Sequence, residues 1–88
     1  MDQMKIAIYV KARCRRCLRA KRLLRRRNYA FEAIDVSGDD ELLNWLVEAT
    51  GCKTVPKVFV DGRLVGGLAV VRALDSSGDL DQLVRGAV

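Results

Sequence analysis

Three cysteines are the residues of this chain best suited to chemistry, and two of them stand only three positions apart. Cys14 and Cys17 enclose two arginines in the stretch ARCRRCLRAK, whereas Cys52 follows much later. A C-x-x-C pair suits either thiol–disulfide exchange or one half of a metal site. Because the surrounding positions are strongly basic, a nucleic-acid-binding arm is a third interpretation.

Residue counts argue against the metal site. The chain has 88 residues, three cysteines and no histidine. Within one chain, neither a His-containing zinc site nor a Cys₄ site can be completed, so we expect no metal. An iron–sulfur cluster shared between two chains stays open as an alternative. The absence of histidine also means that a nucleophilic thiol must be activated by its surroundings.

The elements predicted around the cysteines place them unequally. An apolar run at residues 5–10 predicts a strand buried on both faces, and residues 14–27, without Gly or Pro, predict a helix. Cys14 then lies at the helix N-terminus, where free backbone N–H groups and the dipole stabilise a thiolate. Cys17 falls on the apolar stripe with Ala20, Leu23 and Leu24, so we expect it to be the less accessible thiol.

The rest of the chain completes an α/β pattern. Strands are predicted at residues 29–36, 57–60 and 63–65, and helices at 41–49, 68–74 and 79–84. The first strand–helix–strand unit implies a parallel pair, and Asp61-Gly62 predicts a hairpin between the last two strands. We therefore expect one domain spanning residues 1–88, with a four-stranded mixed sheet flanked by helices.

Charge is concentrated in the cysteine region. The net charge is +5, and residues 11–27 hold ten basic side chains and no acid. This favours anionic partners. Nucleic acid is the less favoured partner, because no aromatic side chains alternate with the arginines and the same helix must bury an apolar stripe. No segment is apolar enough to span a membrane, and no secretory signal is evident, so we expect a cytoplasmic protein.

A second motif is Thr54-Val55-Pro56, with the only proline of the chain at the start of a predicted strand. Together with the cysteine pair, several segments in order make the chain resemble a glutaredoxin over nearly its whole length. The segments are IYVKARCRRC, AKRLL, FEAIDV, TVPKVFVDG, GG and ALDSSGDLDQLV. The resemblance implies a thioredoxin-like fold, a cis proline at position 56 and a monomer. It also implies reduction of disulfides and glutathionylated proteins with glutathione as co-substrate.

The resemblance also assigns roles to particular residues. Cys14 corresponds to the nucleophilic cysteine and Cys17 to the resolving one. Lys11 corresponds to a basic residue that contacts the glycine carboxylate of glutathione, and Arg16 occupies a flanking position that is usually aromatic. The remaining glutathione contacts correspond to Thr54, Val55 and Pro56, which pair with its cysteinyl backbone, and to Gly67, Leu68 and Ala69 at a helix N-terminus.

Two departures from the family pattern change what we expect of the reactivity of Cys14 and of glutathione binding. Arg15-Arg16 replaces a common Pro-Tyr pair, which should favour the thiolate, attract anionic substrates and raise the redox potential. Leu68-Ala69-Val70 lacks the aspartate that usually binds the γ-glutamyl amine. Losing a hydrogen bond to a charged group costs about 1.5–3 kcal/mol, so we expect weaker glutathione binding. A redoxin recycled by thioredoxin reductase is therefore the main alternative. For Cys52 a packing role is favoured over that of a peripheral regulatory thiol open to glutathionylation, and for Trp45 we expect packing within its helix.

Overall fold

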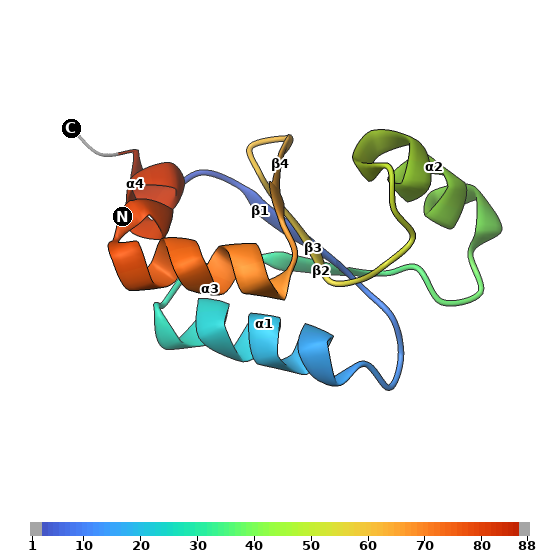
Figure 1. Ribbon diagram of the computed structural model, residues 1–88, viewed down its shortest axis with the longest axis horizontal. Coiled ribbons are helices and arrows are strands. Elements are labelled where there is room, and N and C mark those ends of the chain that lie inside the picture. Colours follow the sequence, from blue (N-terminus) through green and yellow to red (C-terminus); the bar gives the residue numbers. More distant parts are fainter. Residues whose placement is uncertain (1–2, 87–88) are drawn as a thin grey trace.

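The computed structural model describes residues 3–86, which form a four-stranded sheet with helices on both faces (Figure 1). The strands lie in the order β2-β1-β3-β4. Their bounds are β1 (Ile6–Val10), β2 (Glu32–Asp35), β3 (Lys57–Val60) and β4 (Arg63–Gly66). β1 and β2 are parallel, whereas β3 is antiparallel to both β1 and β4. This confirms the predicted mixed sheet and the thioredoxin-like fold.

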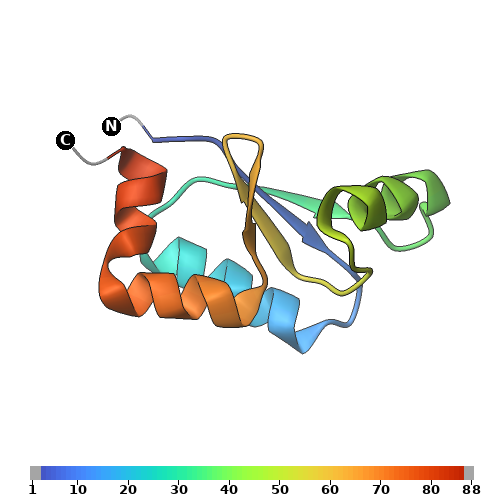
Figure 2. The same cartoon turned by 45° about the horizontal axis from the view of Figure 1, so that its top comes forward.

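One face of the sheet carries most of the core. Helices α1 (Arg15–Arg26) and α3 (Leu68–Ser77) lie side by side on this face, and α4 (Asp79–Arg85) follows α3 (Figure 2). Ile6, Ile8 and Val10 of β1 are buried against them. The predicted apolar stripe of α1 is confirmed, since Cys17, Ala20, Leu23 and Leu24 are all buried. This packing fixes the position of the cysteine-bearing helix against the sheet.

The opposite face is covered less completely, by helix α2 (Asp40–Thr50) alone. The side chains buried on this face of the sheet are Val36, Leu46 and Phe59. The prediction that the first strand is buried on both faces was therefore only half right. Ala7 and Tyr9, which point toward the α2 face, are partly exposed because α2 reaches only part of the sheet.

Two predicted boundaries differ from the structure by three residues, and several others differ by one. The strand predicted from residue 29 begins only at Glu32, because Tyr29 turns back to α1, where its N–H donates to the Leu24 carbonyl at 3.0 Å. Helix α3 continues to Ser77 and ends at Gly78, whose φ is +87°, rather than stopping before the serines. Of the helices that the structure describes between residues 3 and 86, none is long and apolar enough to cross a membrane.

Candidate active site

Cys14 caps the N-terminus of α1, one position before the helix begins. Its backbone is extended, and its Sγ accepts a hydrogen bond from the N–H of Cys17 at 3.1 Å. The loop leading to it is held by the N–H of Ala12, which donates to Ser37 Oγ at 2.8 Å. The sulfur is half-buried and lies beside the positive end of the helix dipole. This is the position predicted for a nucleophilic thiol.

Cys17 lies one turn further into α1 and is only 2% exposed. Burial, followed by its interaction with the Cys14 side chain, raises the pKa of Cys17 to about 11, against an opposing hydrogen bond from the Lys11 backbone. At neutral pH Cys17 is therefore a protonated thiol. The predicted contrast in accessibility between the two cysteines is confirmed.

A hollow of about 500 Å³ lies beside the start of α1, where β3 and α3 also begin. The Val55–Pro56 peptide bond on its wall is cis, as the resemblance implied. Its lining residues come from three elements and their connections, and they are Arg16, Arg19, Thr54, Val55, Pro56, Lys57, Gly67, Leu68, Ala69, Val70 and Arg72. We call this hollow the active-site groove.

The groove brings together every predicted glutathione contact except Lys11. Lys11 lies outside the lining, after β1, with its backbone hydrogen-bonded to Cys17. The groove also contains residues that the sequence reasoning missed. Arg19 follows Arg16 by three positions on α1, and Arg72 follows Leu68 by four on α3, so helical periodicity was the available signal. Lys57 and Val70 complete the set that was missed.

The turn between β4 and α3 requires glycine for two reasons. Gly66 has a φ of +146°, and a Cβ there would lie 2.8 Å from the Cβ of Val70. A Cβ on Gly67 would lie 3.3 Å from the carbonyl oxygen of Pro56. The two glycines thus allow the N-terminus of α3 to approach the Pro56 segment closely. The first three N–H groups of α3, at residues 68–70, have no partner within the helix.

Positive charge dominates the groove. Arg16, Arg19, Lys57 and Arg72 line it, and its described lining contains no acidic residue. α3 also has no acid in its first turn, in agreement with the departure noted in the sequence. The groove therefore suits an anionic ligand such as a carboxylate.

Cys52 lies just after α2 and is partly buried, as expected. It also belongs to a small hydrogen-bonded group at the edge of the groove. Its Sγ is 2.9 Å from Thr54 Oγ1, and Lys57 Nζ donates to the same oxygen at 2.8 Å. Hydrogen bonds from the Thr54 side chain and backbone, with Lys57 adding positive charge, lower the pKa of Cys52. The surroundings of Cys52 therefore include a hydrogen-bonded group as well as packing contacts.

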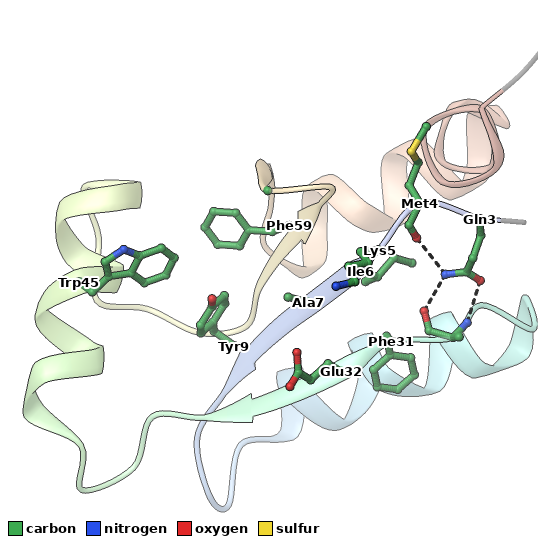
Figure 3. Close-up of a pocket in the computed structure, with 12 residues that line it drawn as sticks. Gln3, Met4, Lys5, Ile6, Ala7, Tyr9, Phe31, Glu32, Trp45 and Phe59 are labelled. Atoms are coloured by element: carbon green, nitrogen blue, oxygen red, sulfur yellow. Dashed lines mark hydrogen bonds between the residues drawn. The ribbon is translucent and has the colours of Figure 1, made fainter.

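A more apolar hollow of about 550 Å³ lies on the α2 face, away from Cys14 and Cys17 (Figure 3). Tyr9, Trp45 and Phe59 form an aromatic cluster there, with ring centroids 5.3–5.9 Å apart. Trp45 packs as predicted, although 45% of it stays exposed. No cysteine lines either hollow, but Cys14 lies only two residues before Arg16, which lines the smaller, basic groove, whereas no residue of α1 lines the larger hollow. We therefore assign thiol chemistry to the side of the basic groove.

The described part of the chain, residues 3–86, contains no group of three Cys, Asp or Glu side chains arranged to hold a metal ion. Cys14, Cys17 and Cys52 all carry free thiols.

Comparison with known proteins connects this arrangement to one family. The family model described as Glutaredoxin matches residues 6–65. Glutaredoxin 1 of Rickettsia felis is 39% identical over 83 residues, which cover 92% of this chain and 81% of the relative. The solution structure of glutaredoxin from Brucella melitensis has a TM-score of 0.85 and 35% identity, and covers 100% of this chain and 97% of that one. The crystal structure of a buckwheat glutaredoxin–glutathione complex has a TM-score of 0.84 and 27% identity, and covers 90% of this chain and 74% of that one.

Proposed function

The chain belongs to the glutaredoxin family of thiol–disulfide oxidoreductases, and from this premise we propose that it reduces disulfides with electrons from glutathione. The observation that carries the proposal is the position of Cys14. Its sulfur caps α1 two residues before Arg16, which lines the basic groove together with the Val55–Pro56 segment and the N-terminus of α3. A family neighbour of known structure is a complex with glutathione, which supports glutathione as the ligand of this groove.

In the proposed complex, the groove holds glutathione by its charged ends and its backbone. The N–H groups of Leu68 and Ala69, at the positive end of α3, would bind the γ-glutamyl carboxylate. The backbone of Val55 would pair with the cysteinyl unit as an added strand does. Arg16 and Lys11 would attract the glycine carboxylate. This directs the glutathione sulfur toward Cys14.

The proposed reaction begins with attack of the Cys14 thiolate on the glutathione sulfur of a mixed disulfide, R–S–S–G. A bond forms between Cys14 and that sulfur while the bond to R–S breaks, and R–S⁻ takes up a proton from water. A glutathione thiolate then attacks the glutathione sulfur held on Cys14. Oxidised glutathione leaves and the Cys14 thiolate is restored, so R–S–S–G and glutathione yield R–SH and oxidised glutathione.

For a protein disulfide, we propose that Cys17 acts as the resolving thiol. Attack by Cys14 first gives a mixed disulfide with the protein and frees one protein thiolate. Cys17 then attacks Cys14 Sγ, forming the Cys14–Cys17 disulfide and releasing the second protein thiol, which carries away the Cys17 proton. The high pKa of Cys17 keeps it protonated until this step. Two glutathione molecules then reduce the disulfide and leave as oxidised glutathione.

A coupled assay tests the proposal. Turnover of hydroxyethyl disulfide is followed through NADPH consumption, once with glutathione and glutathione reductase and once with thioredoxin reductase alone. We expect turnover in the first system. Recycling by thioredoxin reductase is the specific rival to this proposal, because α3 offers no acid in its first turn to bind the γ-glutamyl amine of glutathione. Turnover only with thioredoxin reductase would therefore overturn the proposal.

We further propose a cytoplasmic monomer, which cell fractionation and gel filtration would test.

A further inference from the structure

A smaller hollow of about 190 Å³ lies along the seam between α1 and α3, next to the active-site groove. Four arginines and one leucine line it, namely Arg19, Arg22, Leu23, Arg26 and Arg72. α1 and α3 run side by side along this seam (Figure 1). Leu23 is buried, whereas the four arginines are exposed. We call this set of four arginines the arginine seam.

The arginine seam continues the active-site groove, because Arg19 and Arg72 line both hollows. Arg19, Arg22 and Arg26 follow one another at intervals of three and four residues, which places them along one side of α1. With a rise of about 1.5 Å per residue, the path from Cys14 to Arg26 is about 18 Å long. An extended peptide covers that length in about five or six residues.

Other arginines of the same region have partners within the fold. Arg27 is paired with Asp75 at 2.6 Å, and the Arg25 guanidinium lies 5.5 Å from the centre of the Phe31 ring. In contrast, no seam arginine has a carboxylate within 4 Å in the described part of the chain. Four neighbouring positive charges repel one another, so an anion that enters the seam relieves repulsion as well as gaining attraction.

We propose that the arginine seam binds an acidic segment of a protein substrate whose disulfide is held at Cys14. The inference rests on the proposed function and specifies its substrate class. In the substrate, the acidic side chains would lie about five residues from the cysteine that reacts with Cys14, because an extended chain of that length spans the path from Cys14 to Arg26. A polypeptide fits better than a nucleic acid for two reasons. The seam is continuous with the groove that receives the disulfide, and the lining of both hollows contains no aromatic side chain for base stacking.

The test compares two cyclic peptides, each closed by one disulfide and followed by four neutral residues. One then carries three acidic residues and the other carries their amide counterparts. With the native protein at low ionic strength, we expect kcat/KM to be about tenfold higher for the acidic peptide. In the double variant Arg22→Gln/Arg26→Gln, the preference should fall to about twofold, because Arg19 and Arg72 remain. Turnover of the neutral hydroxyethyl disulfide should stay unchanged, since neither residue lines the active-site groove.

The matched control is Lys5→Gln/Arg63→Gln, which removes the same charge from exposed residues outside the seam. We expect it to keep the tenfold preference. Equal use of both peptides by the native protein, or equal loss of preference in the two double variants, would overturn the inference, since the latter would reflect net charge alone. An unchanged preference in Arg22→Gln/Arg26→Gln would also overturn it.

Binding of labelled peptides whose cysteines are replaced by serine separates this inference from the proposed function. Fluorescence anisotropy should detect the acidic peptide on the native protein and weaker binding to Arg22→Gln/Arg26→Gln, whether or not glutathione supports turnover. A missing reaction with hydroxyethyl disulfide and glutathione would contradict only the proposed function. If the double variant instead loses binding of a single-stranded DNA oligomer but not of the peptide, the seam takes nucleic acid and the inference is wrong.

Discussion

The two faces of the sheet differ in how completely helices cover them and in which side chains they present. On one face, α1, α3 and α4 bury a continuous core that includes Leu24 and Val71, both fully buried. On the other face, α2 alone buries a small cluster and leaves Trp45 nearly half exposed. Both cysteines of the C-x-x-C pair and the arginine seam belong to the well-packed face.

The difference shows where chemistry is positioned in this fold. The buried core under α1 and α3 holds both helix N-termini in place, so that residues 68–70 of α3 and Arg16, two positions after Cys14, line the same groove. The α2 face has a larger hollow, but it is lined mainly by apolar side chains and by no residue of the cysteine-bearing helix α1. Size and apolar character alone would thus have pointed to the wrong face.

The largest difference between the faces should be in activity. Cys14→Ser should reduce turnover of hydroxyethyl disulfide to the background rate, because a serine oxygen cannot form the disulfide-bonded intermediate with glutathione. Trp45→Leu, on the α2 face, should keep most of the activity. The coupled assay with glutathione measures both variants. Substantial activity in Cys14→Ser would contradict the assignment of the nucleophile.

Stability should show the next largest difference. Leu24→Ala removes a fully buried side chain from the α1 face and should lower the free energy of unfolding by about 3 kcal/mol. Trp45→Ala should cost only about 1 kcal/mol, since the indole is 45% exposed. Urea denaturation followed by circular dichroism gives both values. Equal losses would mean that the α2 face is as important to the fold as the α1 face.

A smaller effect is expected at the turn that joins the sheet to α3. Gly66→Ala should destabilise the protein by about 2 kcal/mol, because the new Cβ would overlap Val70 in addition to requiring a φ of +146°. Gly38→Ala is the matched control: its φ is +72°, but no atom lies within 4 Å of the new Cβ, so about 1 kcal/mol is expected.

A second change checks the cause of the Gly66 effect. Shortening the neighbour with Val70→Ala in the Gly66→Ala background should recover part of the loss, as measured by the urea midpoint. No recovery would assign the whole cost to the backbone angle.

The smallest effect is expected in alkaline solution. Burial, together with the hydrogen bond to Asp81, raises the pKa of Tyr29 to about 12, and burial raises the pKa of Cys17 to about 11. Both groups bind their protons more tightly in the folded protein. Their contribution to stability is therefore complete below pH 9 and is lost as pH rises toward 12.

Single substitutions compare Tyr29 with Tyr9, the tyrosine on the opposite face of the sheet. Tyr29→Phe should flatten the loss of stability between about pH 10 and 12, where the folded and unfolded pKa values of this tyrosine differ. Tyr9→Phe on the α2 face should flatten it less, because that ring is only partly buried. Thermal unfolding midpoints measured from pH 8 to 12 test this order. Equal flattening by the two variants would contradict it.

The sequence alone was sufficient for the fold and for most of the candidate site. The apolar stripe through Cys17 and Leu24 predicted the buried side of α1, and helix position predicted that Cys14 would be the more accessible thiol. Thr54-Val55-Pro56 and Gly67 were expected near the cysteines, and they line the same groove as Arg16. The first two predictions succeeded because they depend on local periodicity and on helix ends, whereas the placement of Thr54-Val55-Pro56 and Gly67 is what the resemblance to glutaredoxins implied.

Tertiary structure decided the features that depend on which elements meet. The partial exposure of Tyr9 follows from how far α2 extends over the sheet, which no local pattern states. Arg72 joins the arginines of α1 only because α3 packs beside α1, and Cys52 meets Lys57 only through the turn at Thr54. The side chains in each such contact are far apart in the chain or separated by a turn. The distance between these side chains in space is determined by the packing of the core, whereas helix ends and apolar stripes are determined by residues close together in the sequence.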